Sequence, residues 1–255
     1  MILAIDIGNT NIVLGCIEGE ETLFEARMAT DSIKTSDQYC AELKNMLELF
    51  RVTPDQIDGS ILSSVVPPVS NAICKAVMRL TGKEPMVVGP GLKTGLNIKI
   101  DNPAQAGSDL IVAAVAALAE YGAPLIIIDL GTATTITVVD KNGSFIGGSI
   151  HPGVKLSLRS LTQGTAQLPG ISLEEPKKTI GTNTVDSMRS GILFGAAAML
   201  DGMIDRMEKE LGYPARVIAT GGLAHLIVPL CNREMTVDDH LLLKGLLRIY
   251  RRNIK

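Results

Sequence analysis

Two short segments of the chain combine an aspartate, a glycine and small polar residues directly after an apolar run. The first is Asp6-Ile7-Gly8-Asn9-Thr10-Asn11, which follows the apolar residues 2–5. Glycine lets a ligand approach the backbone, and the N–H, hydroxyl and amide groups that follow can donate to phosphate oxygens. Phosphates repel a carboxylate unless a cation lies between them, so Asp6 in such a site indicates Mg²⁺. Taken alone, this segment is more often a hairpin turn.

The second segment of this kind opens the other half of the chain. Residues 126–128 are isoleucines, and Asp129-Leu130-Gly131-Thr132-Ala133-Thr134 follows them. Each copy predicts a strand, a tight turn and a second strand. Two such hairpins in matching places favour a phosphate clamp over two unrelated turns. We therefore predict two similar α/β halves, residues 1–119 and 120–255, with a ligand cleft between them.

Two further segments are candidates for nucleotide and proton chemistry. Thr220-Gly221-Gly222-Leu223-Ala224 places a glycine pair between an apolar strand and a helix, where the backbone can pack against a flat ring or a phosphate. Asp109 follows Gly107-Ser108 at the start of an alanine-rich helix. A carboxylate at this position can stabilise the helix N-terminus, accept a proton from a substrate hydroxyl, or do both.

The elements that must position these residues follow from the hydrophobic pattern. Apolar runs and helical patterns alternate between glycines and prolines, which predicts an α/β fold. Strands are expected at residues 2–7, 12–17, 61–66, 86–88, 125–129 and 135–139. Helices are expected at residues 109–121 and 192–207.

Composition and charge exclude several classes of protein. Hydrophobic residues make up 46% of the chain and charged residues 20%, which supplies a core and excludes disorder. A net charge of −3, 3% aromatic residues and no Trp argue against a nucleic-acid partner. The longest apolar run, residues 110–119, is shorter than the ~20 residues that cross a membrane, and the N-terminus lacks a secretory pattern. Four scattered cysteines fit reduced thiols, so we expect a cytoplasmic protein.

The ordered set of motifs resembles that of the type III pantothenate kinases over nearly the whole chain. Besides the segments above, the set comprises Gly89-Pro90-Gly91 to Gly95, Asp101-Asn102-Pro103, Gly147-Gly148 to Pro152-Gly153, Gly181-Thr182-Asn183-Thr184 and Leu243-Lys244-Gly245-Leu246 to Asn253. The resemblance implies the fold of acetate and sugar kinases, Hsp70 and actin. In this fold two ribonuclease H-like domains face each other across a nucleotide cleft. The resemblance also implies a homodimer.

The resemblance further implies a reaction and a set of roles. ATP would phosphorylate the primary hydroxyl of pantothenate to 4′-phosphopantothenate, the first step of coenzyme A synthesis, with Mg²⁺ and a monovalent cation (K⁺ or NH₄⁺). Asp109 would accept the proton, and Asp129 would hold the monovalent cation. The residues that would bind ATP are Asp6, Ile7, Gly8, Asn9, Thr10, Asn11, Ile12, Val13 and Thr132. Those that would contact pantothenate are Ile100, Gly107, Ser108, Asp109, Leu110 and Thr184, with Thr184 acting across the dimer interface.

Two positions depart from the family pattern on the acceptor side. Leu110 stands where the family usually has Arg, and Ile100 stands where it usually has Tyr. Leucine cannot replace a charged donor that pairs with a carboxylate. Lys93 and Lys99 are candidates to supply the missing charge. Two alternatives therefore stay open: a kinase for another small hydroxylated acceptor, or an impaired paralogue that acts as a nucleotide-binding regulatory protein.

Overall fold

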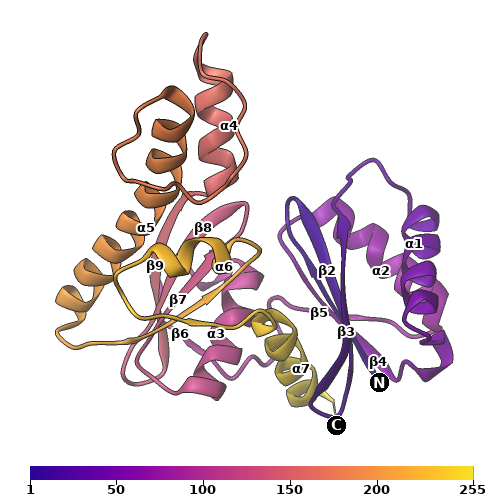
Figure 1. Ribbon diagram of the computed structural model, residues 1–255. Helices are drawn as coiled ribbons and strands as arrows, with labels where there is room; N and C mark the ends of the chain where they lie inside the picture. The colour runs from indigo at the N-terminus through magenta and orange to yellow at the C-terminus, as the bar shows by residue number, and fades with distance from the viewer. Residues whose placement is uncertain (255) are drawn as a thin grey trace. The chain divides into compact units, whose positions relative to one another are not determined.

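The computed structural model describes residues 1–254 and forms two compact units, and most of their elements are labelled in Figure 1. The first unit comprises Met1–Leu96, Asp101–Ala116 and the chain from His240 onward, and the second comprises Asn97–Ile100 and Ala117–Asp239. The sequence-based division after residue 119 lies close to the crossing after Ala116. It places the chain from His240 onward in the second half, whereas these residues pack in the first unit. Lys255, which ends the predicted second half, lies outside the described residues.

The first unit is built on a five-stranded sheet in the order β3-β2-β1-β4-β5. Its strands are β1 (Ile2–Ile7), β2 (Asn11–Glu18), β3 (Glu21–Ala29), β4 (Gly59–Ser64) and β5 (Met86–Val87). β2 is antiparallel to both β1 and β3, whereas β4 is parallel to both β1 and β5. The strand predicted at 61–66 ends at Ser64 instead, because Pro67 begins a helix and proline has no N–H for a strand ladder.

Helices pack on both faces of the first sheet. α1 (Ser36–Leu49) and α2 (Pro67–Thr81) pack together in the core that contains Leu3, Ile5 and Ile7. α7 (Leu241–Asn253) packs in a second core that contains Ala4. Successive side chains on a strand point to opposite faces, so β1 contributes to both cores. The other elements that begin in this unit are η1 (Pro54–Gln56), η2 (Pro103–Gln105) and α3 (Ser108–Tyr121).

The second unit is built on a six-stranded sheet in the order β11-β10-β7-β8-β9-β6. Its strands are β6 (Asn97–Ile98), β7 (Leu125–Leu130), β8 (Ala133–Val139), β9 (Ser144–Pro152), β10 (Arg216–Thr220) and β11 (Thr236–Val237). β7, β8 and β9 are antiparallel neighbours, and β10 is parallel to both β7 and β11. Five of these strands therefore repeat the order and directions of the first sheet, which confirms the predicted internal repeat.

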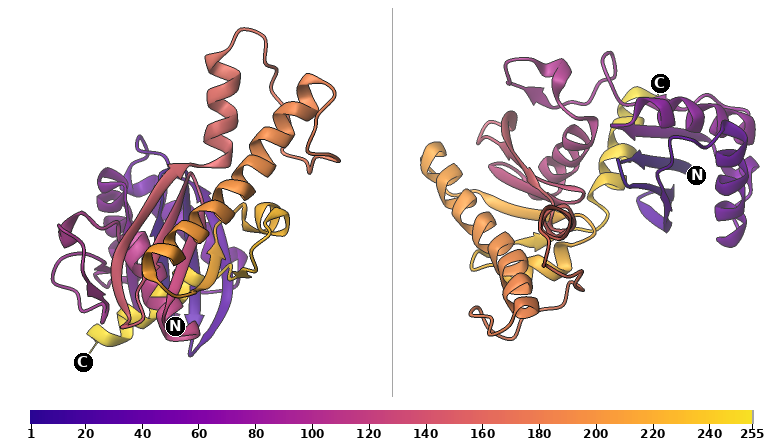
Figure 2. Two further views of the ribbon diagram at one scale, coloured as in Figure 1. Left: turned by 90° about the vertical axis from the view of Figure 1, so that its left-hand side faces the viewer. Right: turned by 90° about the horizontal axis from the view of Figure 1, so that it is seen from above.

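One long helix packs against the second sheet. α5 (Thr184–Leu211) packs through its middle and C-terminal part against Ile126, Ile128 and Leu130. Its N-terminal part stands beside α4 (Val154–Gly164), beyond the ends of the strands, in Figure 1 and in the left view of Figure 2. Two short helices, α6 (Ala224–Ile227) and η3 (Val228–Leu230), complete the layer. None of the helices in residues 1–254 has the length and hydropathy of a membrane span.

A close approach of two helices in the first unit depends on one glycine. A Cβ atom on Gly245 of α7 would lie 2.1 Å from the carbonyl oxygen of Val112 in α3. We expect Gly245→Ala to lower the free energy of unfolding by about 1–3 kcal/mol, because the backbone at Val112 must shift. Thermal unfolding measures this change.

Gly195→Ala in α5 is the matched control, since no atom lies within 4 Å of its Cβ position. Alanine favours helix over glycine, so this variant should melt at or above the temperature of the parent chain. Equal melting of the Gly245→Ala variant and the parent chain would contradict the close approach of α7 and α3.

Candidate active site

The first predicted phosphate segment forms the hairpin between β1 and β2. Asp6 lies opposite Val13 on β2 and Ser63 on β4, and only 7% of the residue is exposed. The N–H of Gly8 donates to the carbonyl oxygen of Asn11 (3.0 Å), which closes the turn. Asp6 therefore stands at the carboxyl end of β1, next to a tight turn.

The residues of this hairpin differ in what they can offer a ligand. Ile7 and Ile12 are fully buried in the core beneath α1 and α2, so only their backbone atoms can reach a nucleotide. The exposed side chains of the hairpin belong to Asn9, Thr10 and Asn11. The turn thus presents amide, hydroxyl and backbone groups, which suit phosphate oxygens.

Asp109 lies in the first turn of α3, in the same unit as the first hairpin. Its Oδ1 accepts a hydrogen bond from the N–H of Leu110 (2.9 Å). Burial raises the pKa of the Asp109 carboxyl above its ordinary value, and the hydrogen bond from Leu110 partly opposes this shift. A Cβ atom on Gly107 would lie 2.4 Å from Oδ1, so glycine leaves the space that the carboxylate occupies.

The hydroxyl of Ser108 attaches the start of α3 to the end of β4. It accepts hydrogen bonds from Ser63 Oγ (2.9 Å) and from the N–H of Ser64 (3.1 Å), and it donates to the carbonyl oxygen of Ser64 (3.0 Å). Ser63 is the strand partner of Asp6. Asp109, the next residue after Ser108, is therefore fixed at the same sheet edge as Asp6.

The second predicted segment forms the hairpin between β7 and β8. Asp129 lies opposite Thr135 on β8 and Thr220 on β10, so these three side chains share one face of the sheet. The hydroxyl oxygen of Thr135 is buried and has no hydrogen-bond partner among residues 1–254. The second hairpin therefore places a carboxylate between two hydroxyl groups.

Two glycines pack against this second hairpin. A Cβ atom on Gly221 would lie 2.4 Å from Asp129 Oδ1, and Gly221 has a φ of +95°, which disfavours other residues. A Cβ atom on Gly153 would lie 2.2 Å from the carbonyl oxygen of Thr132. The glycine motifs at 153 and 221 therefore leave room for the turn and for the carboxylate of Asp129.

Each hairpin offers a single carboxylate rather than an acidic cluster. Throughout residues 1–254, no three His, Cys, Asp or Glu side chains lie close enough to hold a metal ion together. Mg²⁺ in nucleotide sites is usually held by one or two carboxylates, with waters and substrate phosphates as its other ligands. Asp6 and Asp129 each fit a site of this kind, in which a nucleotide contributes to the binding of the cation.

The residues expected to contact the acceptor fall in both units. Residues 107–110 belong to the first unit, whereas Ile100 belongs to the second, where it lies against Gly147. Lys99, a candidate to replace the missing Arg, forms an ion pair with Asp140 in the second unit (Nζ to Oδ2, 3.9 Å). Its positive charge is therefore already paired with a carboxylate. Lys93 is exposed in the first unit.

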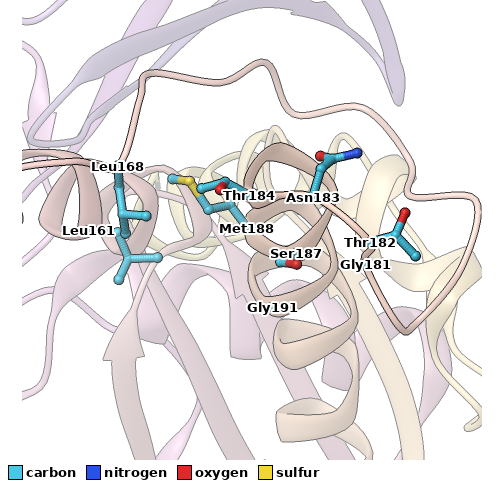
Figure 3. A pocket seen from close by; sticks show the side chains of 9 residues that line it. All are labelled: Leu161, Leu168, Gly181, Thr182, Asn183, Thr184, Ser187, Met188 and Gly191. Carbon is cyan, nitrogen blue, oxygen red and sulfur yellow. The ribbon is translucent and has the colours of Figure 1, made fainter.

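Thr184, the last expected acceptor contact, is the first residue of α5. Asn183 caps this helix, since its Oδ1 accepts from the N–H of Asp186 (2.9 Å). A hollow of about 520 Å³ lies between α4 and α5, and Figure 3 shows Thr184 and Met188 on one side of it and Leu161 on the other. Thr184 thus stands beside space for a ligand or for another chain.

The sequence analysis did not identify the residues that hydrogen-bond to the site segments from other elements. Ser63 and Thr30 contact the site segments at separations of 45 and 22 positions along the chain. The hydroxyl residues at the end of β4 were the available signal, because parallel strands end at one edge of a sheet. The partners of those hydroxyl groups could not be predicted without the fold.

Comparison with known proteins identifies the relatives of the chain. The model of the type III pantothenate kinase family matches residues 2–206. A type III pantothenate kinase from an Exiguobacterium species is 47% identical over 255 residues, which cover 100% of both chains. Component A of (R)-2-hydroxyglutaryl-CoA dehydratase from Acidaminococcus fermentans gives a TM-score of 0.58 at 15% identity, over 98% of this chain and 96% of that chain. A Sinorhizobium meliloti protein described provisionally as a 2-dehydro-3-deoxygalactonokinase gives 0.60 at 14% identity, over 98% of both.

The repeated hairpins and sheets, together with these structural likenesses, define the class of the protein as the actin-like ATPase and sugar kinase fold. Within that class, the chain belongs to the type III pantothenate kinase family, since the family model spans most of the chain and a full-length relative shares nearly half of its residues. The fold class and the family expected from the motifs are both confirmed.

The packing of Gly221 against Asp129 gives a prediction for nucleotide binding. Gly221→Ala must displace the carboxylate or the turn, at a cost of about 1–3 kcal/mol, so we expect ATP to bind roughly tenfold more weakly. Isothermal titration calorimetry measures the affinity.

Gly143→Ala is the control for this variant, because Gly143 also has a positive φ (+74°) but lies in the turn before β9, where its Cβ position has only ordinary contacts. It should bind ATP as the parent chain does. Equal weakening in both variants would refute a specific role for the space beside Asp129.

Proposed function

We propose that this chain transfers the γ-phosphoryl group of ATP to the primary hydroxyl of pantothenate. The observation that carries the proposal is the attachment of Asp109 to the carboxyl end of the strand beside Asp6, through Ser108 and Ser63. When a hydroxyl attacks a phosphate, the reaction needs a proton acceptor and a group that positions the phosphate. Asp109 and the first hairpin turn can supply these two functions at one sheet edge. Family membership supports pantothenate as the acceptor.

Asp109 accepts the proton of the pantothenate hydroxyl as its oxygen attacks the γ-phosphorus and the bond to the β-phosphate oxygen breaks. A carboxylate with a raised pKa is a stronger base than an exposed one, which favours this transfer. The hydrogen bond from Leu110 to Oδ1 leaves Oδ2 as the oxygen that can turn toward the substrate. The proton passes to Oδ2, and ADP leaves.

The first hairpin binds and orients the ATP phosphates in this proposal. Donor groups of the turn contact the phosphate oxygens, and residues 6–13 hold the chain of phosphates along the edge of the sheet. Asp6 would hold Mg²⁺, which would neutralise the phosphate charge. Phosphoryl transfer depends mainly on such positioning and charge stabilisation.

In the second hairpin, Asp129 would hold the monovalent cation, K⁺ or NH₄⁺, and Thr132 would contact ATP. The carboxylate of Asp129 and the buried hydroxyl of Thr135 supply oxygen donors, which hard cations prefer. The cation would supply further positive charge to the bound nucleotide.

Pantothenate binds to residues 107–110 and Ile100 in this proposal, and Thr184 of a second copy completes the site in a homodimer. Large apolar side chains exposed on β9, α4 and the loop before α5 support an interface there: Ile150, Leu156, Leu161 and Ile180. Leu110 and Ile100 are more apolar than the Arg and Tyr that the family usually has at these positions. Free cysteines and the use of ATP fit a cytoplasmic protein.

Removal of the proton acceptor tests the proposal directly. Asp109→Asn keeps the shape of the side chain but cannot take a proton, so we expect pantothenate-dependent ADP release to fall by at least about 100-fold while ATP affinity stays unchanged. A coupled assay measures ADP, and calorimetry measures ATP binding.

Asp55→Asn is the matched control, since Asp55 is an exposed aspartate in the first turn of η1, within the same unit. It should retain full turnover. A parent chain that binds ATP without pantothenate-dependent ADP release would instead favour a nucleotide-binding regulator or a different acceptor.

The pH dependence of kcat/KM follows from the direction of the Asp109 pKa shift. The base must be deprotonated, so activity falls as the pH drops through its pKa. Because burial raises that pKa, the loss should begin at a higher pH than for an ordinary aspartate, whose pKa is about 4. Initial rates at constant ionic strength give the profile. An acidic limb at or below the ordinary value would contradict a buried base.

A further inference from the structure

Thr30 makes two hydrogen bonds to the turn of the first hairpin. It follows β3, and its Oγ1 donates to the carbonyl oxygen of Gly8 at 2.7 Å. Its N–H donates to the carbonyl oxygen of Thr10 at 3.0 Å. One residue therefore engages two carbonyl groups of a turn that lies 22 positions earlier in the chain.

These two bonds fix the direction of two peptide planes. In a trans peptide the C=O and N–H groups of one unit point in opposite directions. Because the carbonyls of Gly8 and Thr10 point toward Thr30, the N–H groups of Asn9 and Asn11 point away from it. A rotation of either peptide would exchange an N–H donor for a carbonyl oxygen, whose partial negative charge repels phosphate.

The loop that carries Thr30 is itself anchored in the core. The N–H of Asp31 donates to Tyr39 Oη (3.0 Å), and Tyr39 Oη donates to the carbonyl oxygen of Asp31 (2.7 Å). Tyr39 belongs to α1 and is fully buried. The residue that follows Thr30 is therefore attached to a buried side chain of α1, which fixes the position from which Thr30 bonds the turn.

We propose that Thr30 is a positioning residue for ATP, because its hydroxyl holds the Gly8 carbonyl away from the phosphates and so sets the turn for binding. This inference rests on the proposed function, since it concerns the same nucleotide site. In this proposal Thr30 acts through the peptide that joins Gly8 and Asn9. The backbone N–H bond to Thr10 secures the other peptide and does not depend on the side chain.

The test compares two substitutions at one position. Thr30→Val keeps the branched shape and the backbone N–H but lacks the hydroxyl donor, whereas Thr30→Ser keeps the hydroxyl. We expect Thr30→Val to raise the KM for ATP and the Kd for ADP by about fivefold to tenfold, the effect of one lost hydrogen bond. Thr30→Ser should stay within about twofold of the parent chain on the same scale.

A purely structural role would not separate the two substrates. The KM for pantothenate at saturating ATP should be the same in the parent chain and in both variants. Thr30→Cys keeps the size of serine and has a weaker donor, so its KM for ATP and Kd for ADP should lie between those of the Ser and Val variants. If the Val variant does not fold, the Cys variant tests whether a weaker donor at position 30 weakens nucleotide binding.

The outcomes distinguish this inference from the function on which it rests. A parent chain that binds ADP, with a Thr30→Val variant that binds it equally well, would overturn the role of Thr30 alone. Equal increases in the KM for ATP and for pantothenate would also overturn it. A parent chain that binds neither ATP nor ADP would overturn the proposed function itself.

Discussion

The attachment of α3 to β4 through the Ser108 hydroxyl is the constraint on which the candidate active site depends. The three hydrogen bonds of that hydroxyl, each worth about 1 kcal/mol, hold the first turn of the helix at the carboxyl end of a parallel strand pair. Asp6 is the penultimate residue of β1, the neighbouring strand of that pair. Asp109 is therefore fixed near the end of β1 by the hydrogen bonds between Ser108 and the end of β4, and not by a loop.

The alternation of side chains along β1 and β7 explains why Asp6 and Asp129 lie outside the apolar cores of their units. Leu3, Ile5 and Ile7 face α1 and α2, so the intervening position Asp6 must face the other way. Ile126, Ile128 and Leu130 face α5 in the second unit, with the same consequence for Asp129. A shift of one residue in either strand would bury a carboxylate in an apolar core, which makes the register of both hairpins strongly determined.

Much of this arrangement could be predicted from the sequence, because the decisive signals are local. The apolar run before Asp6, the Gly8 turn and their repetition at Asp129 identified the hairpins and the fold. The division after residue 119 could not show that the chain from His240 onward packs in the first unit, because that packing joins segments far apart in the sequence. The contacts of Ser108 and Thr30 join distant segments, so their partners appear only once the chain is folded. The sequence suggested that Leu110 contacts the acceptor, but it could not show which residue, if any, replaces the charge of the Arg that the family usually has there.

The groups around Asp6 and Asp109 are proposed to transfer a phosphoryl group to pantothenate. Mass spectrometry of the acceptor, after incubation of the chain with ATP, Mg²⁺, K⁺ and pantothenate, measures this transfer. We expect pantothenate to gain one phosphoryl group on its primary hydroxyl for each ADP formed. Unmodified pantothenate in a mixture where the chain demonstrably binds ATP would rule out this reaction.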